Sequence, residues 1–217
     1  MIFDVDGVLL ELTTAEEDVF FIALAGFVPT SELSRDWNSY RIRNDDDIVT
    51  EILERYGKPA ELKSTILTSY IAALHAALAS HKLTSPTIAG AKDLLLSLPA
   101  QIKLGIATAN LGAAAALRLQ AAGLWDHVKD HAQGADGGGH KHQILARLLT
   151  TLPVSKDRIV YIGDNINDVI AGKLNGVHFI GFSTDPQRRE QLVDHGVKLL
   201  SCSHTTTLDL IRQILGV

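Results

Sequence analysis

Two aspartates, Asp4 and Asp6, follow a short apolar run at the start of the sequence, in the stretch MIFDVDGVLL. Side chains on a β-strand alternate between its two faces, so Asp4 and Asp6 are predicted to point to the same side. Two carboxylates held side by side repel each other, and an ordinary core strand would not tolerate them. Either a positive group or a shared proton must therefore lie between them.

More polar residues follow two later apolar runs. IKLGIAT (102–108) ends at Thr108, and RIVYIGD (158–164) ends at Asp164, with Asp168 about one helical turn further on. Ligands of open parallel sheets bind beyond the carboxyl ends of the strands. We therefore expect four carboxylates, from two distant segments, to converge on one site.

A hard divalent cation with oxygen ligands would neutralise this cluster, and Mg²⁺ suits one or two carboxylates together with water and a substrate phosphate. Lys141, just before a predicted helix, would add a fixed positive charge. Thr108 offers a hydroxyl, and the backbone N–H groups after it can cradle a phosphate at a helix N-terminus.

These residue types suit phosphoryl transfer. An aspartate can act as a nucleophile and form an aspartyl-phosphate. A carboxyl group two residues further on can protonate the leaving oxygen and then activate the water that cleaves this intermediate. A metal ion and a lysine stabilise the charge on the transferring group, where most of the catalysis of phosphoryl transfer lies.

The elements that must position these residues fall into two groups. After residue 87, short apolar runs alternate with helical patterns, which favours a parallel sheet covered on both faces. The predicted strands are 102–108, 158–164, 177–182 and a weaker one at 197–200, and the opening MIFD adds one more. Helical patterns lie between them.

Residues 13–85 instead show only helical patterns. Thr13 and Glu16 have capping-box spacing before a first helix. A second helix starts in the run of aspartates at 45–47, and a third follows Pro59. We therefore predict an α/β, Rossmann-like core (1–12 and 86–217) whose first loop carries an inserted cap domain, a small helical bundle at 13–85.

The bulk composition excludes several classes of protein. The net charge is −5 with a pI of about 6.0, so no broad nucleic-acid footprint is expected. No apolar run approaches the ~20 residues that span a bilayer, and no signal-peptide pattern is present, so no membrane partner is expected. The single cysteine, Cys202, fits a reducing cytoplasm.

DVDGV (4–8), TAN (108–110), a lysine before a helix, and GDNIND (163–168), in this order, resemble the four motifs of the haloacid dehalogenase-like (HAD) superfamily. The similarity covers nearly the whole chain. The helical insert after DVDGV resembles the all-helical cap of phosphoglycolate phosphatase and β-phosphoglucomutase relatives, and TANLGAAAALRLQAAGL is similar to the phosphoglycolate phosphatase-like branch.

The resemblance implies a role for each motif residue. Asp4 would be the nucleophile. Asp6 would be the general acid and base, with its backbone carbonyl also binding Mg²⁺. Thr108, Ala109 and Lys141 would hold the phosphoryl group. Asp164 would be a metal ligand, and Asp168 would be either a ligand or a partner of the residues that bind the ion. Asp6 favours phosphate esters, because the dehalogenase and phosphonatase branches lack an aspartate at this position.

The sequence departs from the family pattern in three places. Only three residues precede Asp4, so the first strand is expected to be short and frayed. Ala109 stands where glycine is common, a small change that should leave the backbone contacts intact. His142 follows Lys141 where many relatives have proline.

The implied activity is a Mg²⁺-dependent phosphatase, a phosphoric monoester hydrolase, acting on a small phosphorylated metabolite such as phosphoglycolate or a sugar phosphate. The same residues would also serve a β-phosphoglucomutase-like phosphomutase, in which a sugar hydroxyl replaces water. A catalytically silent protein that binds a phosphorylated ligand is a third reading. A receiver-like phosphoacceptor is a fourth, but Asp6 and the long insert count against it.

Two arginines, Arg41 and Arg43, are the candidates for substrate specificity. A planar guanidinium suits a carboxylate or a phosphate, so one of the two is expected to face the core and grip a substrate anion. The other reading is a solvated cap surface. The protein is expected to be a monomer or a weak homodimer.

Overall fold

The computed structural model describes residues 1–216 and contains one six-stranded sheet, with the strand order β3-β2-β1-β4-β5-β6 and every neighbouring pair parallel. The strands are β1 (Ile2–Phe3), β2 (Gly105–Ala107), β3 (Ala132–Gln133), β4 (Val160–Gly163), β5 (His178–Phe182) and β6 (Leu200–Ser201). The helices are α1 (Thr14–Leu24), α2 (Asp45–Arg55), α3 (Leu62–Ala79), α4 (Ala91–Ser97), α5 (Gly112–Ala121), α6 (Trp125–Val128), α7 (Lys141–Thr151), α8 (Ile166–Asn175), α9 (Pro186–Asp194) and α10 (His204–Leu215). Short 3₁₀ turns lie at Thr30–Glu32, Trp37–Ser39, Lys129–His131 and Lys156–Arg158.

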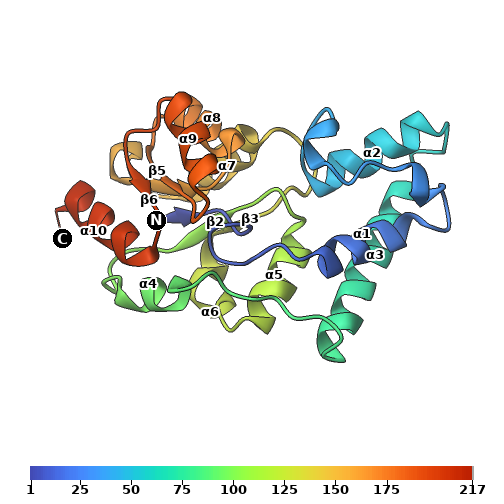
Figure 1. Ribbon diagram of the computed structural model, residues 1–217, viewed down its shortest axis with the longest axis horizontal. Helices are drawn as coiled ribbons and strands as arrows, with labels where there is room; N and C mark the ends of the chain where they lie inside the picture. Colours follow the sequence, from blue (N-terminus) through green and yellow to red (C-terminus); the bar gives the residue numbers. More distant parts are fainter. Residues whose placement is uncertain (217) are drawn as a thin grey trace.

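Both faces of the sheet are covered, as the sequence predicts. Successive strand residues point to opposite faces. Phe3 and Ile162 join the hydrophobic cluster beneath α4, α5, α6 and α10, whereas Ile2 and Tyr161 join the cluster beneath α7 and α8. Figure 1 shows these two helical layers on either side of the strands. The α/β, Rossmann-like fold class is therefore confirmed.

The expectation that the first strand is frayed is wrong. β1 is only two residues long, yet it is a central strand that pairs with β2 on one side and β4 on the other. Ile2 and Phe3 are fully buried, and the N-terminal amine donates a hydrogen bond to Lys103 O at 2.7 Å. Pairing on both sides and burial hold a short strand that would fray at an edge.

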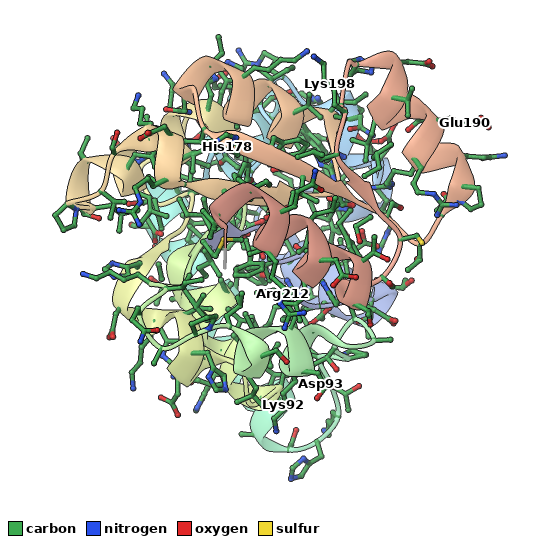
Figure 2. All side chains as sticks on the ribbon, turned by 90° about the vertical axis from the view of Figure 1, so that its left-hand side faces the viewer. Lys92, Asp93, His178, Glu190, Lys198 and Arg212 are labelled. Atoms are coloured by element: carbon green, nitrogen blue, oxygen red, sulfur yellow. The ribbon has the colours of Figure 1, made fainter. Side chains whose placement is uncertain are left out.

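Four elements escaped the sequence prediction. β3 is a two-residue edge strand with no apolar run, and α6 is a single turn. α9 buries only Leu192, so it carries almost no periodic signal. α10 is amphipathic and covers the sheet beside α4. Figure 2 looks onto this end of the core, where the labelled charged residues are exposed and include none of the predicted site residues.

The three longer helices of segment 13–85 pack together to the right of the sheet in Figure 1. We call this segment the cap. α1 begins at the predicted capping box, with Thr13 as N-cap and Glu16 reaching back to it. The buried residues of the cap form one cluster that continues into Leu111 and Ala114, at the start of α5. The cap therefore rests on the helix that follows β2.

One cap helix, α3, is the only helix within residues 1–216 whose length and composition would allow it to cross a membrane. Its Ile66, Tyr70 and Leu74 are four residues apart and buried, and they belong to the hydrophobic cluster shared with α1 and α2. Packing within the cap therefore accounts for its apolar stripe.

Candidate active site

The predicted site residues meet at the carboxyl ends of β1, β2 and β4. They line a cleft of about 630 Å³ between the sheet and the cap, a size suited to a small molecule. Eight of the nine residues singled out from the sequence line this cleft: Asp4, Asp6, Arg43, Thr108, Ala109, Lys141, Asp164 and Asp168. Arg41 does not, because it pairs with Glu51 and Glu54 on the outer surface of the cap.

Lys141 is the positive group beside Asp4. Its Nζ atom lies 2.7 Å from Asp4 Oδ1 and 3.1 Å from Asp168 Oδ1, and all three side chains are nearly buried. Burial alone would favour the neutral amine, but the two carboxylates outweigh it and raise the pKa of Lys141 above its ordinary value. Lysine at this position is therefore a permanent cation.

Asp6 has a different cation. The NH2 atom of Arg118 lies 2.6 Å from Asp6 Oδ1, and Asn110 Nδ2 donates to Asp6 Oδ2 at 3.0 Å. Burial tends to raise the pKa of Asp6, but Arg118 outweighs it and leaves this pKa below its ordinary value. The two aspartates thus do not share one positive group, since each has its own.

Three carboxylates remain crowded. Oxygen atoms of Asp4, Asp164 and Asp168 all lie within 4.8 Å of one another. Burial, followed by the neighbouring Asp168, raises the pKa of Asp164 to about 6. Burial also raises the pKa of Asp4, and Lys141 offsets this only in part. An oxygen-rich cluster that holds excess negative charge in a buried place fits a hard divalent cation such as Mg²⁺.

Both carboxylate oxygens of Asp168 accept hydrogen bonds within the protein. Its Oδ1 accepts from the hydroxyl of Tyr161 at 2.5 Å as well as pairing with Lys141. Its Oδ2 accepts from the N–H of Asn165 at 3.1 Å and completes the capping box of α8. Both oxygens of Asp168 therefore have partners, whereas Asp4 is paired through Oδ1 and Asp164 through Oδ2.

The loop after β2 leaves fewer backbone N–H groups available for a phosphate than the sequence predicts. Asn110 N donates to Thr108 Oγ1, Leu111 N donates to Asp45 Oδ2, and Gly112 N donates to the carboxylate of Asp136. Within residues 1–216, the N–H of Ala109 keeps no such partner, and Ala109 lines the cleft. Ala109 N and the hydroxyl of Thr108 are the donors that stay available.

Two glycines leave room for the acidic residues of the cluster to lie close to the backbone. Gly7 has a φ of +75°, and a Cβ placed there would lie 2.4 Å from Asp164 Oδ2. At Gly163 a Cβ would lie 2.3 Å from the Cβ of Asp168. A side chain at either position would push an acidic residue away from the cluster.

The first turn of α2 docks the cap onto the core. Asp45 N donates to Ala109 O at 3.1 Å, and Asp45 Oδ2 accepts from Leu111 N at 2.8 Å. Asp47 Oδ2 accepts from Gly139 N at 2.7 Å. The sequence indicated only an acidic helix start here, and the N-cap is Asn44. These aspartates hold the cap against the loops that follow β2 and β3.

Sequence reasoning missed two arginines in this region. Arg188, in α9, pairs with Asp164 Oδ2 at 2.5 Å and lines the cleft. It follows β5, so a scan of every strand end would have found it. Arg118 lies in the predicted helical pattern AAAALRLQAAG, where a lone arginine on a small, apolar face is the available signal.

Comparisons with solved structures give the same fold over essentially the whole chain. A predicted phosphatase from Clostridium acetobutylicum has a TM-score of 0.69 and 22% identity, with 100% of this chain and 97% of that one covered. CbbY from Rhodobacter sphaeroides, in complex with phosphate, has a TM-score of 0.66 and 21% identity, with 94% and 93% covered. The HAD-hydrolase YfnB from Bacillus subtilis, bound to magnesium, has a TM-score of 0.62 and 19% identity, with 100% and 97% covered.

A comparison with curated protein sequences finds no match. The family model of haloacid dehalogenase-like hydrolases, however, matches residues 1–182. That range contains the cap and every predicted site residue, and its motifs form the cleft described above. By this match and by its fold, the chain belongs to the haloacid dehalogenase-like hydrolase family.

Proposed function

We propose that this protein is a Mg²⁺-dependent phosphatase that hydrolyses a small phosphorylated metabolite through an aspartyl-phosphate on Asp4. The observation that carries the proposal is the placement of Asp4. Its carboxylate lies at the base of the cleft, 2.7 Å from the Lys141 cation and beside the carboxylates of Asp164 and Asp168. A nucleophile for a phosphate ester needs such a setting, because substrate and carboxylate are both anionic.

Each residue of the site then has a step. Asp4 attacks phosphorus while Thr108, Ala109 N and Lys141 hold the phosphoryl oxygens. Asp6 is a carboxylate in the site described above, so it must take up a proton when the phosphate ester binds, and it then gives this proton to the leaving oxygen as the P–O bond breaks. Asp6 then takes a proton from the water that attacks the aspartyl-phosphate, and inorganic phosphate leaves.

The proposed cofactor is Mg²⁺, held by Asp4, Asp164 and the backbone carbonyl of Asp6, with Asp168 as a ligand or as the residue that orients Lys141. When bound, the ion would supply charge stabilisation to the transferring phosphoryl group. YfnB is bound to magnesium. In the present chain, the crowded carboxylates and the raised pKa of Asp164 support a cation at this place.

The substrate proposal rests on the size and charge of the cleft. Beyond the phosphate-binding lysine, the cleft is lined by Arg35 and Arg43 from the cap and by Arg188 from α9. A smaller cavity of about 70 Å³ shares Asp6, Trp37 and Arg43 with the cleft. Carboxylates also line this cavity, so a compact, anionic leaving group would need Arg43 as its counter-charge, and Arg43 is the proposed specificity residue. We propose phosphoglycolate or a small sugar phosphate.

Cellular setting and assembly follow the same reasoning. A free, exposed cysteine at Cys202 supports a cytoplasmic enzyme. The proposed assembly is a monomer or a weak homodimer, and the net charge of −5 gives no reason to expect a nucleic-acid partner.

The test is phosphate release from a panel of small phosphate esters, with Mg²⁺ and with a chelator, for the native protein and for Asp4→Asn. The proposal expects turnover that needs both the metal and Asp4. Transfer of the phosphoryl group to a sugar instead of water would establish a phosphomutase. Tight binding of inorganic phosphate by a folded protein with no turnover would establish a silent binding protein.

A further inference from the structure

Arg118 is the largest fully buried side chain of the core and cap, with only 2% of it exposed. Each of the three nitrogen atoms of its guanidinium nevertheless donates to at least one partner. Nε donates to Glu16 Oε1 at 2.7 Å, NH1 donates to Asn110 Oδ1 at 3.1 Å, and NH2 donates to Asp6 Oδ1 at 2.6 Å and to Glu11 O at 3.3 Å. A buried cation is costly unless its partners are in place, so this arrangement is a specific one.

These contacts gather three separate segments around one side chain. Asp6 belongs to the loop after β1, Asn110 to the loop after β2, and Glu16 to the first turn of the cap helix α1. Glu16 Oε1 also accepts from the hydroxyl of Ser85 at 2.7 Å, at the return from the cap to the core. Arg118 is thus the shared partner of the proposed catalytic loop and of the first cap connection, and Glu16 links it to the second through Ser85.

The effect on Asp6 is geometric. One carboxylate oxygen accepts from Arg118 and the other from Asn110, so both oxygens are held. Asn110 is itself held by Arg118 through its own side-chain oxygen. A carboxylate oxygen has two acceptor sites, so each oxygen of Asp6 keeps one free for a proton. The side chain of Asp6 remains 23% exposed and lines the cleft.

A lysine would not reproduce this arrangement. The planar guanidinium serves Glu16 with one edge and Asp6 with another, whereas an ammonium group is a point charge on a flexible stem. A role in stability alone would not require any contact with Asp6, because Glu16 by itself would neutralise the arginine. The contact with the reacting carboxylate is the part that a structural role leaves unexplained.

We propose that Arg118 is a positioning residue for catalysis, which fixes the carboxylate of Asp6 in the orientation from which it exchanges a proton with the leaving oxygen and with the attacking water. This inference rests on the proposed phosphatase function. In this proposal Arg118 acts through Asp6 and Asn110, to which it donates hydrogen bonds.

The test uses two substrates that differ in their need for an acid. p-Nitrophenyl phosphate has a leaving group that departs without protonation, whereas an alkyl phosphate from the panel needs a proton from Asp6. For Arg118→Met we expect the initial burst of p-nitrophenolate to keep its native rate. Single-turnover cleavage of the alkyl phosphate should fall roughly 10²-fold, with KM changed less than about 3-fold. Arg118→Lys should recover part of that loss.

Loss of folding in Arg118→Met is addressed with a second variant. Glu16→Gln combined with Arg118→Met removes both buried charges and keeps an oxygen at Glu16 for the N–H of Thr13. If thermal unfolding shows that Arg118→Met is not folded, the kinetics are measured on the double variant instead. An equal fall in the cleavage rate of both substrates, or no fall for either, would overturn the positioning role. Absence of all turnover in the native protein would instead overturn the proposed function, and the positioning role with it.

Discussion

Lys141 Nζ lies 2.7 Å from Asp4 Oδ1, although the two residues are more than half the chain apart in sequence. The contact exists because β1 is followed by Asp4 and α7 begins with Lys141, and both ends meet at the same edge of the parallel sheet. An ammonium group at this distance offsets the negative charge of a carboxylate that the fold has buried. The proposed nucleophile therefore has its counter-charge built into the core.

The two candidate arginines of the cap should behave differently. Arg43 lines the cleft, whereas Arg41 is two-thirds exposed and pairs with glutamates on the outer surface. Arg43→Ala should lower kcat/KM for an anionic phosphate ester by roughly tenfold or more, because a charge-assisted contact with substrate is lost. Arg41→Ala should leave kcat/KM unchanged. Equal effects of the two substitutions in steady-state kinetics would contradict this assignment.

Asp164 and Asp168 should differ in their effect on metal binding. A ligand at 100 times its Kd stabilises the folded state by about 2.7 kcal/mol, so Mg²⁺ should raise the Tm of the native protein by roughly 5–10 °C. Asp164→Asn should abolish this shift. Asp168→Asn should lower the Tm even without metal, since it weakens the partners of Lys141 and Tyr161, and should retain part of the shift. Calorimetry with Mg²⁺ and EDTA measures both effects.

Gly7 and Gly57 form a matched pair of substitutions. Both have a positive φ, +75° and +59°, so alanine at either position carries a backbone strain of about 1–2 kcal/mol. Only at Gly7 does the added Cβ meet Asp164, because nothing lies within 4 Å at Gly57. Gly7→Ala should weaken Mg²⁺ binding about 10- to 100-fold, whereas Gly57→Ala should cost stability alone. Isothermal titration decides between the two, and similar Mg²⁺ affinities would show that the contact with Asp164 does not matter.

Asp45 should make stability depend on pH. Burial raises its pKa from 3.8 to about 7, against the opposing hydrogen bond from Leu111 N. Between these two values the folded state binds more protons than the unfolded state, so stability from this group is complete below about pH 4 and is lost as the pH rises through about 7. The change amounts to about 4 kcal/mol at most.

The measurement is thermal unfolding from pH 4 to 8 for the native protein and for Asp45→Asn. Asparagine keeps an acceptor for Leu111 N but does not titrate, so the difference between the two curves isolates Asp45 from the other buried acids. The two curves should diverge between about pH 4 and about pH 7 and run parallel above pH 7. Parallel curves over the whole range would show that Asp45 does not titrate in this window.

Much of the site could be predicted because strand ends can be recognised locally. Apolar runs that end at Asp4, Thr108 and Asp164 identify β1, β2 and β4, and the rule that ligands bind at the carboxyl ends brings their last residues together. The same pattern predicted the doubly covered sheet. Elements with weak periodicity, such as β3 and α9, left no such signal.

What the sequence by itself determined is therefore the set of elements and the carboxylates at their ends, since hydrophobic periodicity and turn chemistry are local properties. Only the tertiary structure decided which charge meets which. Arg118 pairs with Asp6 and Glu16, Arg43 faces the cleft while Arg41 does not, and the aspartates of α2 dock on the core loops. Such pairings depend on how the cap packs against the sheet, and the spacing of residues along the chain does not encode which side chains meet there.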